Sequence, residues 1–257
     1  YYTYADNMHS TIADGDKVLF KYIDYTGTED WSSVLGHIDT PQVAVDVIPD
    51  GSGNFIILAN RRYGENNTQD MRIIKVGSDG AIVWDKIHTI SASNIFGQKI
   101  IADGNGGYVI LTNEIGGTPI LYKISSSGVY ENHYEYPQSD PTICYGIAAN
   151  GSGYHLAGEA DNGTDKDGYI LNINLDFTEG TNISETNPTS GNEGFRDIVA
   201  HPNGYLATGS CDNLGEGLND VWLVHYDNGF STELVETLGG ADEDYGVSAV
   251  LVPELFS

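Results

Sequence analysis

The chain has 257 residues and carries 11 Lys and Arg against 37 Asp and Glu, which gives a formal net charge of -26. This charge argues against nucleic acid and anionic membrane surfaces as partners, because their phosphate groups are bound by clustered Lys and Arg. No run of 18 apolar residues occurs, so we expect no membrane-spanning segment.

The remaining composition favours a β-rich protein outside the cell. Few lysines accompany 17 Tyr and 32 Gly, and the length suits one sizeable core. We therefore expect an extracellular or outer-membrane surface location. The sequence starts at Tyr1 in YYTYADN without an export segment, so a signal peptide or a lipidated cysteine would have to precede Tyr1.

From the N-terminus onward the chain repeats one pattern, a turn glycine that follows an apolar run. The runs are KVLFKYIDYTG, MRIIKVGSDG, PILYKISSSG, YILNINLDFTEG and VWLVHYDNG, and they end at Gly27, Gly80, Gly128, Gly180 and Gly229. These glycines are about 50 residues apart, a period that indicates a repeat architecture. Five copies fill the chain.

Each copy contains the signals of four short strands. A first apolar stretch such as GQKIIADG turns tightly into a second such as GYVILTN, because glycine accepts the positive φ of such turns. A polar loop, the strand before the marker glycine and a fourth strand such as AIVWDKIH follow. Alternating β-branched and aromatic residues support strands rather than helices. Four strands per copy are typical of a propeller blade.

The two ends of the chain predict a closed ring. Residues 1–35 carry only the last three strands of a copy, whereas YGVSAVLVPE near the C-terminus resembles the missing first strand. We therefore predict an all-β, five-bladed β-propeller with four antiparallel strands per blade, in which the N- and C-terminal strands close the first blade and remove two exposed edges. The expected single domain, 1–257, has blades at 1–38 with 244–253, 42–90, 95–137, 143–187 and 194–239. A β-sandwich and a fragment of a longer propeller are the competing folds.

A resemblance supports the propeller. The phrase GGYVILTN, a loop, PILYKISSSG and then the Trp-bearing GAIVWDKI resemble the repeats of secreted and lipid-anchored surface β-propellers, abundant in Bacteroidota and also found in archaea. The resemblance covers essentially the whole chain and implies a surface protein, from a group largely without assigned chemistry. The fuller blade junction of these proteins is kept only in GGADEDYGVSAV, at residues 239–250.

An alignment of the first strands predicts the residues that line a central channel. It places Asp46, Lys99, Gly146, Asp197 and Ser248 in one column. A second column two positions earlier, in which small residues such as Ala44 dominate, is expected on the same side of the strands. Asp46, Lys99 and Asp197 are therefore candidates for a small polar ligand or a cation. The alternative is a water-filled channel in which these charges neutralise one another.

An enzyme is the alternative to a binding protein. Five-bladed furanosidases place carboxylates on innermost strands as acid and as base or nucleophile, and Asp46, Asp197 and Glu193 are the residues that could serve. No motif of that enzyme family matches, so we assign no catalytic residue.

We assign no cofactor, and calcium is left open. DNGTDKDG, at residues 161–168, resembles a calcium loop, but Gly163 stands where a ligand belongs and no Glu follows at the twelfth position. The seven His give no metal signature. Cys144 and Cys211 lie toward the same predicted face in neighbouring blades, so either a disulfide or two separate thiols is open.

The function predicted from the sequence is a non-catalytic module for binding or assembly at the cell surface. Its partner would be another surface protein, a second copy or a glycan, within a larger surface assembly. Long loops between second and third strands, such as GEADNGTDKDG, are one expected binding face, because loops on a rigid scaffold vary freely. The aromatic segment around Tyr130, Tyr134 and Tyr136 is the other.

Overall fold

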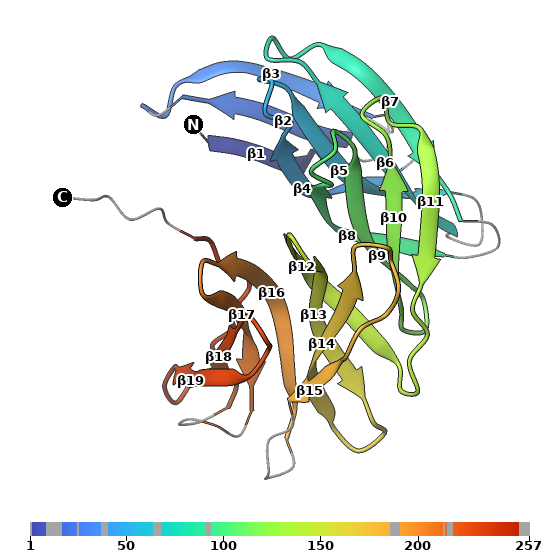
Figure 1. Cartoon of the computed structure of the whole chain (residues 1–257). Coiled ribbons are helices and arrows are strands. Elements are labelled where there is room, and N and C mark those ends of the chain that lie inside the picture. Colours follow the sequence, from blue (N-terminus) through green and yellow to red (C-terminus); the bar gives the residue numbers. More distant parts are fainter. Residues whose placement is uncertain are drawn as a thin grey trace. The chain divides into compact units, whose positions relative to one another are not determined.

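The computed structural model describes residues 2–8, 17–24, 26–36, 41–63, 68–90, 94–185, 191–212, 214 and 218–251. These residues form an all-β structure of antiparallel sheets that follow one another along the chain (Figure 1). None of the described residues belongs to a helix long and apolar enough to cross a membrane. The chain divides into two compact units, the first made of Tyr1–Ile115 and Ile120–Tyr134 and the second of Gly116–Pro119 and Glu135–Ser257.

The first unit contains three sheets. The first sheet has the order β1-β2-β3, the second β4-β5-β6-β7 and the third β11-β10-β9-β8. Their strands are β1 (Tyr2–Met8), β2 (Lys17–Ile23), β3 (Glu29–Leu35), β4 (Gln42–Pro49), β5 (Phe55–Tyr63), β6 (Thr68–Val76), β7 (Ile82–His88), β8 (Ile95–Ala102), β9 (Tyr108–Glu114), β10 (Thr118–Ile124) and β11 (Tyr130–Glu135).

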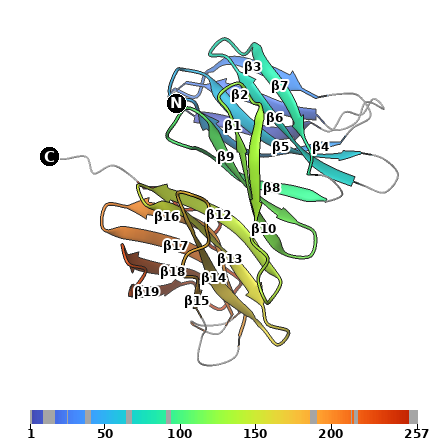
Figure 2. The same ribbon diagram turned by 45° about the vertical axis from the view of Figure 1, so that its right-hand side comes forward.

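The second unit contains two sheets, which lie side by side (Figure 2). The fourth sheet has the order β12-β13-β14-β15 and the fifth β16-β17-β18-β19. Their strands are β12 (Thr142–Asn150), β13 (Gly153–Asp161), β14 (Lys166–Asn174), β15 (Ile183–Glu185), β16 (Glu193–His201), β17 (Gly204–Cys211), β18 (Asp220–Asp227) and β19 (Thr232–Leu238).

Apolar side chains fill the space between neighbouring sheets of each unit. On β5, Ile56 and Leu58 belong to the cluster shared with the third sheet, while Ile57 and Ala59 belong to the cluster shared with the first. Successive side chains of a strand point to opposite faces, so a strand covered on both faces becomes the continuous apolar run FIILA. Burying each Ile or Leu side chain of this run contributes about 1.5–3 kcal/mol.

Each first strand of the four complete sheets contains a β-bulge at the same place. The pairing register shifts between Ala44 and Asp46, and at the equivalent positions of β8, β12 and β16. One extra residue therefore sits opposite the second strand: Val45, Gln98, Tyr145 or Arg196. Because a bulge interrupts the alternation of side chains, residues two apart across it, such as Ala44 and Asp46, point to opposite faces. The expectation that both columns line one face is therefore wrong.

The predicted five-bladed propeller closed by the two chain ends is also wrong. The first sheet has three strands, and within the described residues β1 pairs only with β2. Residues 241–251 form no strand. Instead, Asp244 N donates to Asn219 O at 2.7 Å and Gly246 N to Gly209 O at 3.0 Å, both in the second unit. A strand requires a continuous ladder with a neighbour, and these isolated bonds leave Val247 and Val250 72% and 80% exposed.

Tryptophan side chains of one sheet cover the turn glycines of the next within the first unit. The Trp84 indole donates to Ser126 O at 3.2 Å, and a Cβ built on Gly128 would lie 2.9 Å from the Trp84 ring. Trp31 covers Gly80 in the same way, with its indole donating to Ser78 O at 2.8 Å. The repeated glycines are thus required by packing between sheets as well as by the turn.

A pair of alanine substitutions separates these two requirements. Gly104 and Gly128 have φ of 76° and 73°, but a Cβ at Gly104 would meet nothing within 4 Å. Gly104→Ala should therefore cost only the backbone strain, about 1 kcal/mol, whereas Gly128→Ala should cost about 1–3 kcal/mol more because the methyl group displaces Trp84. Equilibrium denaturation followed by tryptophan fluorescence measures both, and equal losses would contradict the packing role of Trp84.

Candidate functional site

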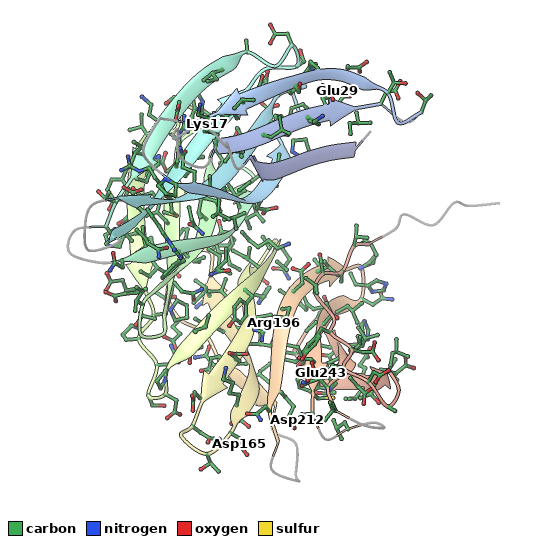
Figure 3. All side chains as sticks on the ribbon, turned by 180° about the vertical axis from the view of Figure 1, so that it is seen from behind. Lys17, Glu29, Asp165, Arg196, Asp212 and Glu243 are labelled. Atoms are coloured by element: carbon green, nitrogen blue, oxygen red, sulfur yellow. The ribbon has the colours of Figure 1, made fainter. Side chains whose placement is uncertain are left out.

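The second unit contains a polar cavity of about 290 Å³. Its walls come from the ends of β13 and β17, the starts of β14 and β16, the segment before β18 and the segment after β19. Its lining includes five charged residues and one tyrosine: Glu159, Lys166, Glu193, Arg196, Asp212 and Tyr245. Figure 3 labels Arg196 on β16 and Asp212 just after β17.

Glu159 is the centre of the charged network in this cavity. Its side chain is 7% exposed, and its two oxygens face two cations, Lys166 Nζ at 2.6 Å from Oε1 and Arg196 Nη1 at 3.0 Å from Oε2. The hydrogen bond to Glu159 raises the pKa of Lys166. A buried carboxylate is stable only when it is paired, so these contacts fix all three side chains at the cavity wall.

The β-bulges position the second contact of Arg196. Its guanidinium carbon lies 4.2 Å from the centre of the Tyr145 ring, and both residues are the bulged residues of neighbouring first strands. A cation over an aromatic face is attracted by the ring quadrupole. The Tyr145 hydroxyl donates to Glu159 Oε1 at 3.3 Å, and burial raises the pKa of Tyr145, so the hydroxyl stays a donor.

Amide and carboxylate groups form the rim of the cavity. Asn192 donates through its backbone N and its Nδ2 to the two oxygens of Asp212, each at 2.8 Å. Asn219 Nδ2 donates to the Tyr245 hydroxyl at 3.1 Å, which itself donates to Glu243 Oε2 at 2.9 Å. Tyr245 is nevertheless 52% exposed, so part of its ring at the rim of the cavity is open to a ligand.

This arrangement suits a neutral ligand rich in hydroxyl groups. Three carboxylates line the cavity against two cations, and both cations already contact Glu159. An anionic ligand would therefore meet net negative charge. Carboxylate and amide groups accept and donate several hydrogen bonds each, and an aromatic ring stacks on an apolar ligand face.

Asp46 and Lys99, two of the residues predicted from the sequence, lie in the first unit. Asp46 Oδ1 accepts the backbone N–H of Val47 at 2.9 Å, and Oδ2 accepts that of Ile100 at 3.0 Å. Ile100 follows Lys99 on β8, the next first strand. The carboxylate of Asp46 therefore ties two neighbouring first strands together.

Asp197, the third predicted residue, plays the same part in the second unit. It is 3% exposed, and its Oδ1 accepts the N–H of Ile198 at 3.1 Å. Its Oδ2 accepts the Ser248 hydroxyl at 2.7 Å and the N–H of Ala249 at 3.1 Å. Asp46 and Asp197 stand in one column of the sequence alignment, and they make equivalent contacts in the structure. These contacts give both residues a structural role. A ligand site made of Asp46, Lys99 and Asp197 together stays a prediction.

The remaining sequence candidates occupy separate places. Cys144 and Cys211 are buried thiols without a disulfide between them, and burial raises the pKa of Cys144 strongly and that of Cys211 to about 11. In the candidate calcium loop, Asn162 Oδ1 accepts the N–H groups of Thr164 and Asp165. No group of three or more His, Cys, Asp or Glu among the described residues is arranged to hold a metal ion.

The aromatic segment divides between the two units. Tyr130 and Tyr134 belong to the first unit, and Tyr130 is 45% exposed. Tyr136 belongs to the second unit, is 4% exposed and donates its hydroxyl to Phe177 O at 3.1 Å, so it packs inward.

Sequence reasoning found Glu193, which lines the cavity and is 2% exposed. It missed Glu159, Lys166 and Arg196. Glu159 and Lys166 both lie within the segment GEADNGTDKDG, which the sequence did single out. The opposite charges near the two ends of that segment were the available signal.

No protein-family model matches the chain, and no curated protein matches it. The solved structures with a similar fold include the following two. Saccharomyces cerevisiae Sqt1 aligns at a TM-score of 0.55 with 12% identity, over 91% of this chain and 57% of Sqt1. A candidate exo-β-1,3-galactanase from Bifidobacterium bifidum s17 aligns at a TM-score of 0.52 with 8% identity, over 94% of this chain and 89% of that protein. This chain thus spans little more than half of Sqt1, and the likeness concerns the fold alone.

The structural role assigned to Asp197 is tested by Asp197→Asn. An amide has only one oxygen, so its NH2 group must face the donors that one of the two carboxylate oxygens of Asp197 now accepts. The second unit should therefore lose about 2 kcal/mol of stability. The exposed Asp242 provides the matched control: Asp242→Asn should change stability by less than about 0.5 kcal/mol. Equal stabilities in chemical denaturation would contradict the assignment.

Proposed function

We propose that this chain is a non-catalytic binding module that takes a neutral glycan into the cavity of its second unit. The observation that carries the proposal is the engagement of both cavity cations by Glu159, at 2.6 and 3.0 Å, which leaves carboxylate, amide and hydroxyl groups to face a ligand. Sugars offer hydroxyl groups that match these side chains and an apolar ring face that matches Tyr245.

The fold comparison supports the ligand class. One structure with a similar fold is described as a candidate exo-β-1,3-galactanase, an enzyme named for a galactan. We therefore choose β-1,3-linked galacto-oligosaccharides as the first ligands to test. Sqt1, another structure with a similar fold, is a WD40 protein, and a protein partner at the same surface is the competing outcome.

A hydrolase is the second candidate function, and one observation favours it. Glu159 and Glu193 are both buried and line one cavity, as the paired carboxylates of glycosidases do. Against it, both oxygens of Glu159 are already held by cations, so the group is poorly placed to give a proton to a leaving sugar. Release of galactose from β-1,3-galactan by the wild type, abolished by Glu193→Gln, would establish the hydrolase instead.

We also propose that the module acts outside the cell, as a surface protein of the repeat type that its sequence resembles. The acidic composition and the phrases GGYVILTN and GAIVWDKI support this location. A glycan ligand would be available there, either on a neighbouring surface or as part of a larger assembly.

The binding proposal is tested by isothermal titration with β-1,3-galactotriose. Tyr245→Ala removes the exposed ring at the cavity rim and should weaken binding at this site about tenfold, equivalent to about 1.4 kcal/mol. Leu234→Ala is the matched control, because Leu234 lies on β19 outside the cavity lining and is 53% exposed against 52% for Tyr245. The control should bind like the wild type.

Two results would overturn the proposal. One is the absence of any binding of the trisaccharide to the wild type. The other is binding that Tyr245→Ala and Leu234→Ala leave equally strong, because the sugar would then occupy a place other than the cavity.

A further inference from the structure

The first unit carries a separate groove of about 420 Å³. It runs between the end of β7 in the second sheet and the turn that joins β10 to β11 in the third. Its lining includes Lys86, Ile87, His88, Tyr122, Val129 and Tyr130. All of them belong to the first unit, so the groove is complete without the second.

His88 gives the groove an unused hydrogen-bonding group. The residue is 6% exposed, and its Nδ1 lies 3.1 Å from the Tyr122 hydroxyl. Its Nε2 is buried and has no hydrogen-bond partner among the described residues. Burial and then the charge of Lys86 lower the pKa of His88 to about 4, so the ring is neutral at ordinary pH. A buried polar atom without a partner is costly and points to an absent partner.

Tyr130 gives the groove an aromatic wall. Its residue is 45% exposed, and its hydroxyl lies 2.9 Å from His133 Nδ1. Tyr122 packs against the same ring, with 5.1 Å between the ring centres. The ring is therefore fixed in place before a ligand arrives, and a ligand that stacks on it loses little additional side-chain entropy.

Apolar side chains and one cation complete the walls. Ile87 and Val129 are 46% and 56% exposed. Lys86 forms no ion pair with any residue in the described part of the chain. Its ammonium group therefore remains a donor for a hydroxyl group in the groove.

We propose that this groove is a second carbohydrate subsite, which takes one neutral sugar ring that stacks on Tyr130 and hydrogen-bonds to His88 and Lys86. A sugar fits because its ring has an apolar face, suited to Tyr130, Ile87 and Val129, and hydroxyl groups at its edge, suited to the two nitrogens. An apolar peptide side chain would leave both nitrogens unsatisfied. The subsite rests on the proposed glycan function and adds a second point of attachment.

Two subsites on one chain have a consequence for polymeric ligands. Once one sugar is bound, the next subsite meets the same polymer at a raised effective concentration. A galactan polymer that reaches both subsites would therefore be held more tightly than a trisaccharide.

The test measures the number of β-1,3-galactotriose molecules bound per chain and the affinity at each site, with four forms of the full chain. The wild type should bind two at full affinity. Tyr130→Ala and Tyr245→Ala should each keep one site at full affinity and bind about tenfold more weakly at the other, and the double variant should bind weakly at both sites. Ile82→Ala is the control for Tyr130→Ala, because Ile82 lies on β7 outside the groove lining and is 50% exposed. This control should bind two.

A second measurement reports on the groove directly. In the Tyr245→Ala chain, addition of the trisaccharide should shift the ¹⁵N resonance of His88 Nε2, and His88→Phe should weaken the remaining binding at least tenfold. The groove proposal is overturned if Tyr130→Ala binds the trisaccharide as tightly as the wild type at both sites, or if the His88 resonance does not move.

The two proposals fail in different ways. If only the groove proposal is wrong, the wild type binds one trisaccharide and Tyr245→Ala weakens that binding about tenfold. If only the cavity proposal is wrong, the wild type binds one trisaccharide and Tyr130→Ala weakens that binding about tenfold. An absence of all binding overturns both.

Discussion

The β-bulge in the first strand of each complete sheet is the constraint on which the candidate site depends. Each bulge adds one residue opposite the second strand, and in the second unit these residues are Tyr145 and Arg196. Without the bulge, regular alternation would send Phe195 and Asp197 to the same face of β16. With it, Phe195 packs in the cluster shared with the fourth sheet, and Asp197 instead ties β16 to the segment that contains Ser248. The bulged residue Arg196 stacks on Tyr145 and reaches Glu159. One local irregularity therefore supplies both a structural contact and a wall of the cavity.

The two proposed subsites also depend on the packing of neighbouring sheets. In the first unit the buried Tyr122 contacts His88 of the neighbouring sheet, and the exposed Tyr130 packs against it. In the second unit, Tyr145 carries Arg196 on one side of the cavity and Tyr245 stands at the rim. Polar groups near these rings are fixed by contacts within the fold, so a sugar would meet groups that are already oriented. The excess negative charge of the chain favours neutral sugars over acidic ones at both places.

Much of the secondary structure could be predicted from the sequence, but the site could not. The turn glycines mark the hairpins because their positive φ is a local requirement, and the strand runs such as FIILA follow from burial on both faces. A bulge leaves no such local signal, so the alternation assumed for Ala44 and Asp46 failed. Closure by the C-terminal segment failed for a different reason, because Asp244, Gly246 and Ala249 find hydrogen-bond partners in the second unit. Partners separated widely in sequence, such as Glu159 and Arg196, become visible only in three dimensions.

The central claim is that the cavity around Glu159 holds a neutral sugar. A crystal structure of the full chain with β-1,3-galactotriose tests it most directly. The account predicts a sugar ring against Tyr245, with hydroxyl groups within hydrogen-bond distance of Asp212 or Glu193, and the contacts of Glu159 with Lys166 and Arg196 unchanged. A cavity filled only by water while the sugar lies elsewhere, or a sugar that binds by breaking the Glu159 ion pairs, would contradict it.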